Sequence, residues 1–374
     1  MGNGYSPLVA GLNRFGLRLQ GELAAASPGE NLVLSPASIG LAMAMLRLGA
    51  RGTTRQLMDR GLGFSGYATD RDFAAGIEEL LAQLAAESGQ RTIAIANSLW
   101  ASLGRLEFHP EFQELCRRYL GAEAAAVDLK RMAGIEQVNG WIEEHTAGRV
   151  KNLLGEKSLN SVALLVNALF FKGSWVRPFE SSSTAHLPFT REDGQRKNVA
   201  TLRGTVGLRS WNRQGRQWLS LPFRGDAEML AMLPRPGQQL AAAVAGLELE
   251  DLEEPEGSVE RRAGLELPRL AIELKSDLLA ILGAQNLGLG AQEGDFSGLA
   301  AGPLVLTGAI HQARVEIDEE GALGVAATFM ALSRGMAEPP ENPLKLDRPF
   351  FFLLREKKTG LILFSGLVYD PGEG

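Results

Sequence analysis

The chain has 374 residues, of which 45% are hydrophobic, so it can bury a large core, and its length alone would allow two domains. Its formal net charge of −6 at pH 7 argues against nucleic acid or an anionic membrane as a partner, because both are bound by basic surfaces. A single cysteine, Cys116, excludes an intramolecular disulfide, so stability must come from packing.

The N-terminal region lacks the basic segment and apolar run of a secretion signal. The longest uncharged run near it, residues 31–46, contains Pro36 and is too short to span a bilayer. We therefore expect a cytoplasmic protein, or a secreted or periplasmic one if a signal has been removed. No linker interrupts the chain, so residues 1–374 are expected to form a single domain.

Glycine-rich residues 61–66 formally fit the pattern of a dinucleotide-binding turn. That fingerprint needs a strand before the glycines and a helix directly after them, whereas a helix-like run from Thr54 to Arg60 precedes them here. We therefore expect no nucleotide cofactor.

Cys116 has apolar neighbours at helical spacing, Phe112, Leu115, Tyr119 and Leu120. This pattern favours a buried structural thiol over a reactive one. The arginine pairs 117–118 and 261–262 are isolated, so we expect solvated faces or local salt bridges there rather than polyanion sites.

Towards the C-terminus, Ala313, Val315 and Ile317 alternate with polar residues, which is the period of a half-buried strand. The pattern stops before Glu319, and strand-like residues resume only at Leu344. Structureless loops of this length are uncommon in compact domains and are usually functional. We therefore interpret the segment as a hinge followed by an exposed loop.

Small residues follow one another at alternate positions of this hinge, namely Ala322, Gly324, Ala326 and Thr328. If the segment becomes a strand, these side chains share one face and could enter a packed sheet without overpacking, which costs ~1–3 kcal/mol per misfit. From these residues alone, a flexible loop of small residues is the competing interpretation.

Motifs of catalysis are missing: there is no phosphate-binding loop ending in Gly-Lys-Ser/Thr and no Gly-x-Ser-x-Gly nucleophile turn. The histidines, His109, His145, His186 and His311, lie far apart, and none has a second histidine at metal-ligand spacing. We expect no metal and no enzymatic activity, with a hydrolase that uses His311 or His186 as the remaining enzymatic alternative.

Several blocks of sequence resemble the serpin family, the serine protease inhibitors, in the family's own order. Residues 344–354 closely resemble the family's C-terminal signature, and residues 359–366 resemble the strand after it. Further blocks are residues 31–39, 139–148, 166–175 and 311–313, so the resemblance runs from about Leu12 to Pro371 and is to a member of prokaryotic type. It implies an α+β fold of about nine helices around three β-sheets, with a long reactive-centre loop at about 319–343.

The resemblance implies a suicide inhibitor. A serine protease would cleave the loop and form an acyl-enzyme, and the freed hinge would then insert into the main sheet and trap the protease. The hinge residues implied are Glu319, Glu320, Gly321, Ala322, Gly324, Ala326, Ala327 and Thr328. The family's usual threonine, glutamate and alanine are replaced by Ala322, Leu323 and Gly324, and the effect of Leu323 stays open.

The family's usual spacing from Glu319 ends at Gly335, which is a poor anchor for a specificity pocket. Arg334 would suit a trypsin-like protease, whereas Met336 would suit an elastase- or chymotrypsin-like one. We favour the bond Arg334–Gly335, because a charge paired in a pocket discriminates strongly. Cleavage after Gly335 or after Met336, before Ala337, remains an alternative.

The resemblance implies two polar clusters in the main sheet. One, the shutter, comprises Ser35, Ser38, Asn167 and His311, and would act as a latch around an entering strand; a satisfied core histidine without a gating role is the competing account. The other, the breach, comprises Trp175, Arg269 and Glu319 at the point where the loop would enter. The family more often has lysine at the position of Arg269, and an inconsequential surface ion pair is the alternative.

The implied partner is a serine protease held in a covalent complex by a monomer that could also form loop-sheet polymers. Residues 72–87 are net acidic where some serpins carry a basic helix, so we expect no glycosaminoglycan cofactor. The alternatives are an inhibitor of elastase-like, chymotrypsin-like or cysteine proteases, and a non-inhibitory serpin that acts as a binding or chaperone-like module.

Overall fold

The computed structural model describes residues 5–85, 91–146, 148–283, 294–301, 306–322 and 342–372. Its α-helices are α1 (Pro7–Ala26), α2 (Pro36–Gly49), α3 (Gly52–Leu62), α4 (Asp70–Ala85), α5 (Pro110–Leu120), α6 (Met132–His145), α7 (Leu240–Val244) and α8 (Leu278–Gly283). Short 3-10 helices cover Glu156–Ser158, Ser181–Ser183 and Leu249–Leu252.

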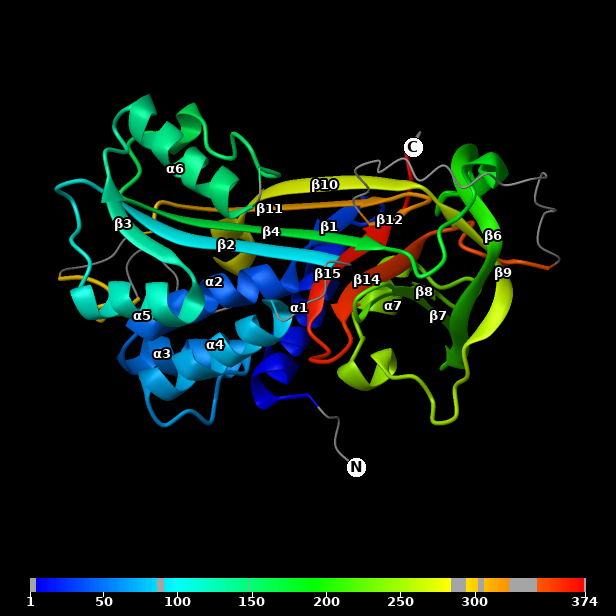
Figure 1. The fold of residues 1–374 in the computed structure, drawn as a ribbon, viewed down its shortest axis with the longest axis horizontal. Coiled ribbons are helices and arrows are strands. Elements are labelled where there is room, and N and C mark those ends of the chain that lie inside the picture. The colour runs from blue at the N-terminus through cyan, green and yellow to red at the C-terminus, as the bar shows by residue number, and fades with distance from the viewer. Residues whose placement is uncertain are drawn as a thin grey trace.

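The main sheet has six strands in the order β10 (Leu270–Asp277), β11 (Gly308–Ile317), β12 (Gly321–Ala322), β4 (Ala163–Ser174), β2 (Arg91–Ser102) and β3 (Glu123–Val127). Its long strands run across the molecule in Figure 1, with α2 to α5 on one side and α6 on the other. The alternation of apolar and polar residues in β11 is matched by its burial, since Ala313, Val315 and Ile317 are all buried.

The other nine strands are connected through the long strand β6 (Arg196–Arg213). The order is β1 (Leu32–Leu34), β15 (Ile362–Val368), β14 (Phe350–Glu356), β8 (Ala227–Leu233), β7 (Arg216–Phe223), β6, β9 (Arg261–Pro268) and β13 (Leu344–Lys345), with β5 (Ala185–Thr190) also paired to β6. Residues 196–208 of β6 pair with β5 and β9, whereas residues 209–213 pair with β7. Divided at this point, the strands form three sheets, which confirms the expected mixed α+β fold.

Helix α2 begins at a well-defined cap. The Ser35 side chain accepts a hydrogen bond from the Ser38 amide at 3.2 Å, and Pro36 occupies the first turn, where its missing N–H costs nothing. Every residue of α2 is buried, and the helix is apolar apart from Ser38 and from Arg47, which is paired with Asp59 and Asp70.

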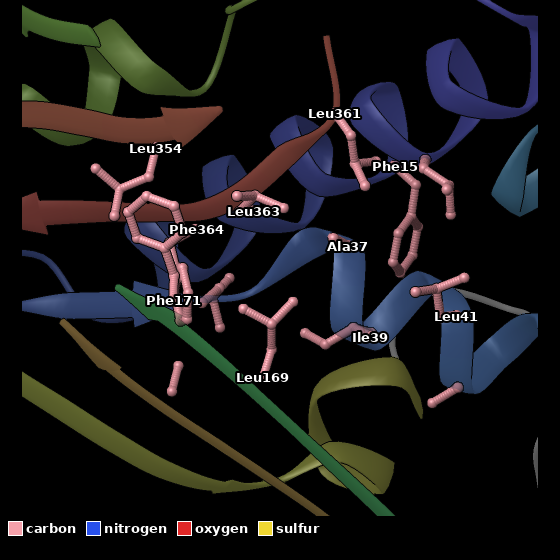
Figure 2. Packing of buried hydrophobic residues seen from close by; sticks show 14 of the residues in the cluster. Phe15, Ala37, Ile39, Leu41, Leu169, Phe171, Leu354, Leu361, Leu363 and Phe364 are labelled. Atoms are coloured by element: carbon pink, nitrogen blue, oxygen red, sulfur yellow. The ribbon is translucent and has the colours of Figure 1, made fainter. Parts of the chain in front are cut away.

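The core lies between the main sheet and the sheet formed by β14 and β15. Figure 2 shows Leu169 and Phe171 of β4 close to Phe364 of β15 and Ile39 of α2, all within one buried cluster. Alternate residues of β4, including Leu164 and Val166, point to the other face and pack with α6. Strand β4 is therefore buried on both faces, which explains its long apolar run.

Candidate functional site: a slot in the main sheet

Strands β4 and β11 are parallel neighbours along only part of their length. They pair from Gly308 with Leu164 to Gln312 with Ala168. Beyond that point, residues 313–316 of β11 pair only with β10, and residues 169–172 of β4 pair only with β2, within the described part of the chain. We call the gap between these facing edges the slot.

Strand β12 occupies the upper end of the slot. Ala322 pairs with Ile317 of β11 and with Gly173 of β4, and Gly321 pairs with Ser174. The two-residue strand is antiparallel to both neighbours, and Figure 1 shows it beside the end of β11. The first two small residues of the predicted hinge have therefore already entered the sheet.

A tight turn brings the chain from β11 into β12. The Asp318 amide donates to the Gly321 carbonyl at 2.9 Å, and the Asp318 carboxylate accepts from the amides of Glu320 and Gly321 at 2.9 and 3.0 Å. Burial raises the pKa of the Asp318 carboxyl above its usual value, although the two amide bonds oppose this rise. Asp318 thus stabilises the turn that leads from β11 into the hinge.

Gly321 is required at this position for two reasons. Its φ of +151° is a backbone conformation that L side chains rarely adopt, and a Cβ there would lie 2.0 Å from the Gly173 carbonyl oxygen and 2.8 Å from the Ser174 Cα. Both obstacles are backbone atoms of β4, so they cannot move aside as a flexible side chain would.

The predicted breach residues lie together at this entrance. The Trp175 indole N–H donates to the Asp318 carbonyl at 2.9 Å, and the Trp175 amide donates to the Glu320 carbonyl at 2.8 Å. The buried indole stacks on Phe223, with ring centroids 4.2 Å apart and planes at 9°. Trp175 therefore fixes the backbone of the turn through two hydrogen bonds.

Glu319 is bound by Arg269 through two hydrogen bonds, one of them from Nε at 3.1 Å. The glutamate side chain is 7% exposed and the arginine 36%. Burial alone would raise the pKa of Glu319, but the hydrogen bonds from Arg269 and from the Thr184 hydroxyl outweigh it and hold this pKa below its usual value.

The predicted shutter residues meet just below the slot. His311 and Asn167 face each other in the pairing of β11 with β4, and the histidine Nδ1 lies 2.7 Å from the Asn167 Oδ1. The Ser35 amide donates to His311 Nε2 at 3.3 Å, and Asn167 Nδ2 donates to the Ser38 carbonyl at 2.7 Å. All four side chains are fully buried.

These partners determine the protonation of His311. Because the Ser35 amide can only donate, Nε2 must be the acceptor, and the proton of the neutral ring must lie on Nδ1. Burial lowers the pKa of His311 to about 3, so the ring is neutral at physiological pH. The shutter is a chain of neutral hydrogen bonds across the sheet.

Three further residues belong to these clusters and were not found by sequence reasoning. Thr184 binds Glu319, Asn97 accepts a hydrogen bond from Asn167, and Asp318 closes the hinge turn. Only Asp318 carries a local signal, as a short polar residue at a strand end three positions before a glycine. The contacts of the other two join residues 135 and 70 positions apart.

Several predicted residues lie outside the described part of the chain. They are the hinge residues Gly324, Ala326, Ala327 and Thr328 and the candidate residues of the reactive bond, Arg334, Gly335, Met336 and Ala337. Their roles remain predictions.

The remaining candidates do not form a second site in the described residues. His109, His145 and His186 are separately placed, with His109 near the Ser297 carbonyl and His145 stacked on Trp141. In the part of the chain that the structure describes, no group of three or more metal-ligating side chains occurs, and no helix is long and apolar enough to cross a bilayer. Cys116 is buried in α5, and burial raises its thiol pKa.

Comparison with known proteins identifies the family. The family model described as serpin (serine protease inhibitor) matches residues 10–371. The chain is a serpin. Bovine leukocyte elastase inhibitor is 31% identical, with 97% of this chain and 99% of the relative covered. Human neuroserpin is 29% identical, with coverage of 95% and 90%, and wheat Serpin-Z1C is 32% identical, with coverage of 97% and 96%.

Solved serpin structures have the same fold. Glycosylated human kallistatin superposes with a TM-score of 0.86 at 25% identity, with coverage of 98% of this chain and 99% of the other. Serpin48 of the insect Tenebrio molitor gives a TM-score of 0.83 at 24% identity, with coverage of 96% and 97%. The family is one of protease inhibitors, so an inhibitory rather than catalytic role is the general expectation for this serpin.

Proposed function

We propose that this serpin is a suicide-substrate inhibitor of a trypsin-like serine protease, which it engages at Arg334–Gly335. One observation carries the proposal: the hinge already sits in the upper end of a slot whose lower edges lack a strand partner in the described residues. A chain end released by cleavage could pair with both edges, which no described strand occupies.

The register of β12 predicts where each inserting residue would go. Continued from Ala322, it places residue 324 between Val315 and Phe171, and residue 331 between Gly308 and Leu164, where the pairing of β4 with β11 begins. Insertion to about residue 331 or 332 would therefore replace the parallel pairing of β4 with β11 by two antiparallel pairings, one to each strand. Antiparallel pairing is slightly more stable per residue.

The same register places Thr328 between His311 and Asn167. The hydrogen bond that joins these two side chains would have to open, and a hydroxyl can donate one hydrogen bond and accept another. Thr328 would thus give each shutter residue a new partner. Buried polar groups left without one would cost ~1–3 kcal/mol each.

In the proposed reaction, the protease nucleophile attacks the carbonyl carbon of Arg334, the bond to Gly335 breaks, and Arg334 remains esterified to the protease. The new strand then inserts. Twelve residues separate Ala322 from Arg334, so at ~3.3 Å each the inserted strand would place the tethered protease ~40 Å from the hinge. Displacement of this size would distort the protease before water can release it.

The test is incubation with trypsin and, separately, with elastase, followed by denaturing gel electrophoresis and mass spectrometry of the released C-terminal peptide. We expect a protease–serpin band that survives denaturation and a new N-terminus at Gly335. The Arg334→Gln variant should lose the trypsin band, whereas the matched Met336→Gln variant should keep it.

Other outcomes would revise the proposal in defined ways. A stable band with elastase and a new N-terminus at Ala337 would make Met336 the specificity residue, in line with the name of the bovine relative. Complete cleavage without any stable band would reject inhibition of these proteases and favour a non-inhibitory binding module.

A further inference from the structure

A pocket of about 450 Å³ lies beside Leu344, the first residue of β13. Its walls include Ser210, Trp211 and Asn212 of β6 and two arginines, Arg261 and Arg348. No carboxylate is among the described residues that line it, although the chain as a whole has a net charge of −6.

Both arginines of the pocket are held by neutral oxygen atoms. Arg261 Nη2 donates to the Ser210 hydroxyl at 2.9 Å, and Arg348 Nη1 donates to the Pro234 carbonyl at 3.3 Å. Ser210 and Pro234 are themselves wall residues, so each guanidinium is anchored at the pocket. Each has five N–H donors, and most remain without a protein acceptor in the described residues.

Nearby arginines show that this lack of carboxylates is local. Arg209 of β6 is paired with Glu228 and Glu254, and Arg216 of β7 is paired with Asp251. The adjoining pocket shares Arg348 but also contains Glu192 and Asp347.

Asn212 in the wall and Arg235 beside it supply further donors. The Asn212 Oδ1 accepts from the Gly215 amide at 3.0 Å, so its Nδ2 group can donate elsewhere. The Arg235 side chain packs over Gly215, where its nearest atom lies 2.7 Å from the position a Cβ would take, and its Nε donates to Gln238.

We propose that this pocket binds a compact polyvalent anion with phosphate, sulfate or carboxylate groups. Two anchored guanidiniums with unused donors and no competing carboxylate match such a ligand, because arginine binds these groups through paired, charge-assisted hydrogen bonds. The assignment concerns a surface distinct from the slot and does not depend on protease inhibition.

The chain offers a matched pair of variants for the test. Arg261 and Arg262 are consecutive residues of β9, so their side chains point to opposite faces of the sheet. Only Arg261 lines the pocket. Arg261→Gln and Arg262→Gln change the net charge equally, so a difference between them reports the pocket and not the overall charge.

Isothermal titration calorimetry with pyrophosphate and with citrate, at low ionic strength, measures the binding. We expect one site per chain, with affinity about tenfold weaker in Arg261→Gln and unchanged in Arg262→Gln, since a hydrogen bond to a charged group is worth about that factor. Arg348→Gln serves as a second pocket variant if Arg261→Gln does not fold, and should weaken binding similarly. Absence of saturable binding by both probes, or equal weakening in both members of the matched pair, would overturn the assignment.

Discussion

Acidification should weaken the shutter through His311. The ring is buried with a pKa of about 3, whereas an unfolded histidine has a pKa near 6.5. Between these values the unfolded chain binds a proton that the folded chain does not, so the free energy of unfolding falls as the pH falls. At pH 5, about 1.5 pH units below the unfolded pKa, His311 alone should remove about 2 kcal/mol of the stability present at pH 7 or above.

The variant His311→Gln isolates this effect. An amide can donate to Asn167 and accept from the Ser35 amide as the neutral ring does, but it does not titrate. The measurement is the free energy of the native unfolding transition in urea at pH 7 and pH 5 for both proteins. We expect the wild type to lose about 2 kcal/mol more than the variant over this interval. Equal losses would refute the assignment of a buried, neutral His311 as the acid-sensitive group of the latch.

Three further outcomes are expected. Gly321→Ala should displace β12 from the sheet, because the alanine Cβ would clash with the Gly173 backbone. Gels after protease treatment should then show more cleaved and less trapped serpin than for the control variant Glu320→Ala, which changes an exposed residue of the same turn. Glu319→Gln should lower the free energy of unfolding by about 1–2 kcal/mol at pH 7. The folded state lowers the pKa of Glu319, so this carboxylate stabilises the protein only while it is ionised, and the difference between wild type and variant should shrink as the pH falls below 4.5. A difference that stays constant with pH would contradict this. Thr328→Val should lower the thermal stability of the cleaved form, with Thr328→Ser restoring it; an unaffected cleaved form would exclude Thr328 from the shutter.

Sequence reasoning predicted the elements around the slot best where a short-range rule applied. The alternation in β11 and the small residues at Gly321 and Ala322 each follow from a short-range physical preference, and the structure places them accordingly. Tertiary contacts follow no such rule. The bond from Thr184 to Glu319 depends on how β5 and β11 are placed relative to each other, which no pattern within either segment encodes.

The two arginines at 261 and 262 show the same limit. As sequence neighbours they were expected to behave alike, as a solvated pair or local salt bridges. In the fold, strand alternation separates them, and Arg261 instead joins Arg348, which lies 87 positions away, at one pocket. A cluster of charge assembled from distant segments is not visible as a run of charge in the chain.

The arrangement of the main sheet also indicates where an inhibitory serpin of this sequence would store free energy. In the described residues, no strand pairs with segments 313–316 and 169–172 on the sides that face each other, and backbone groups left unpaired away from water are costly. The His311–Asn167 bond closes the sheet directly below these edges, while Asp318 and Trp175 hold the hinge at their upper end. Cleavage would remove a constraint that these contacts do not supply, the covalent connection of the loop to β13. The turn at Asp318 would need no rearrangement, because the first strand pairs of the inserted state are already formed there.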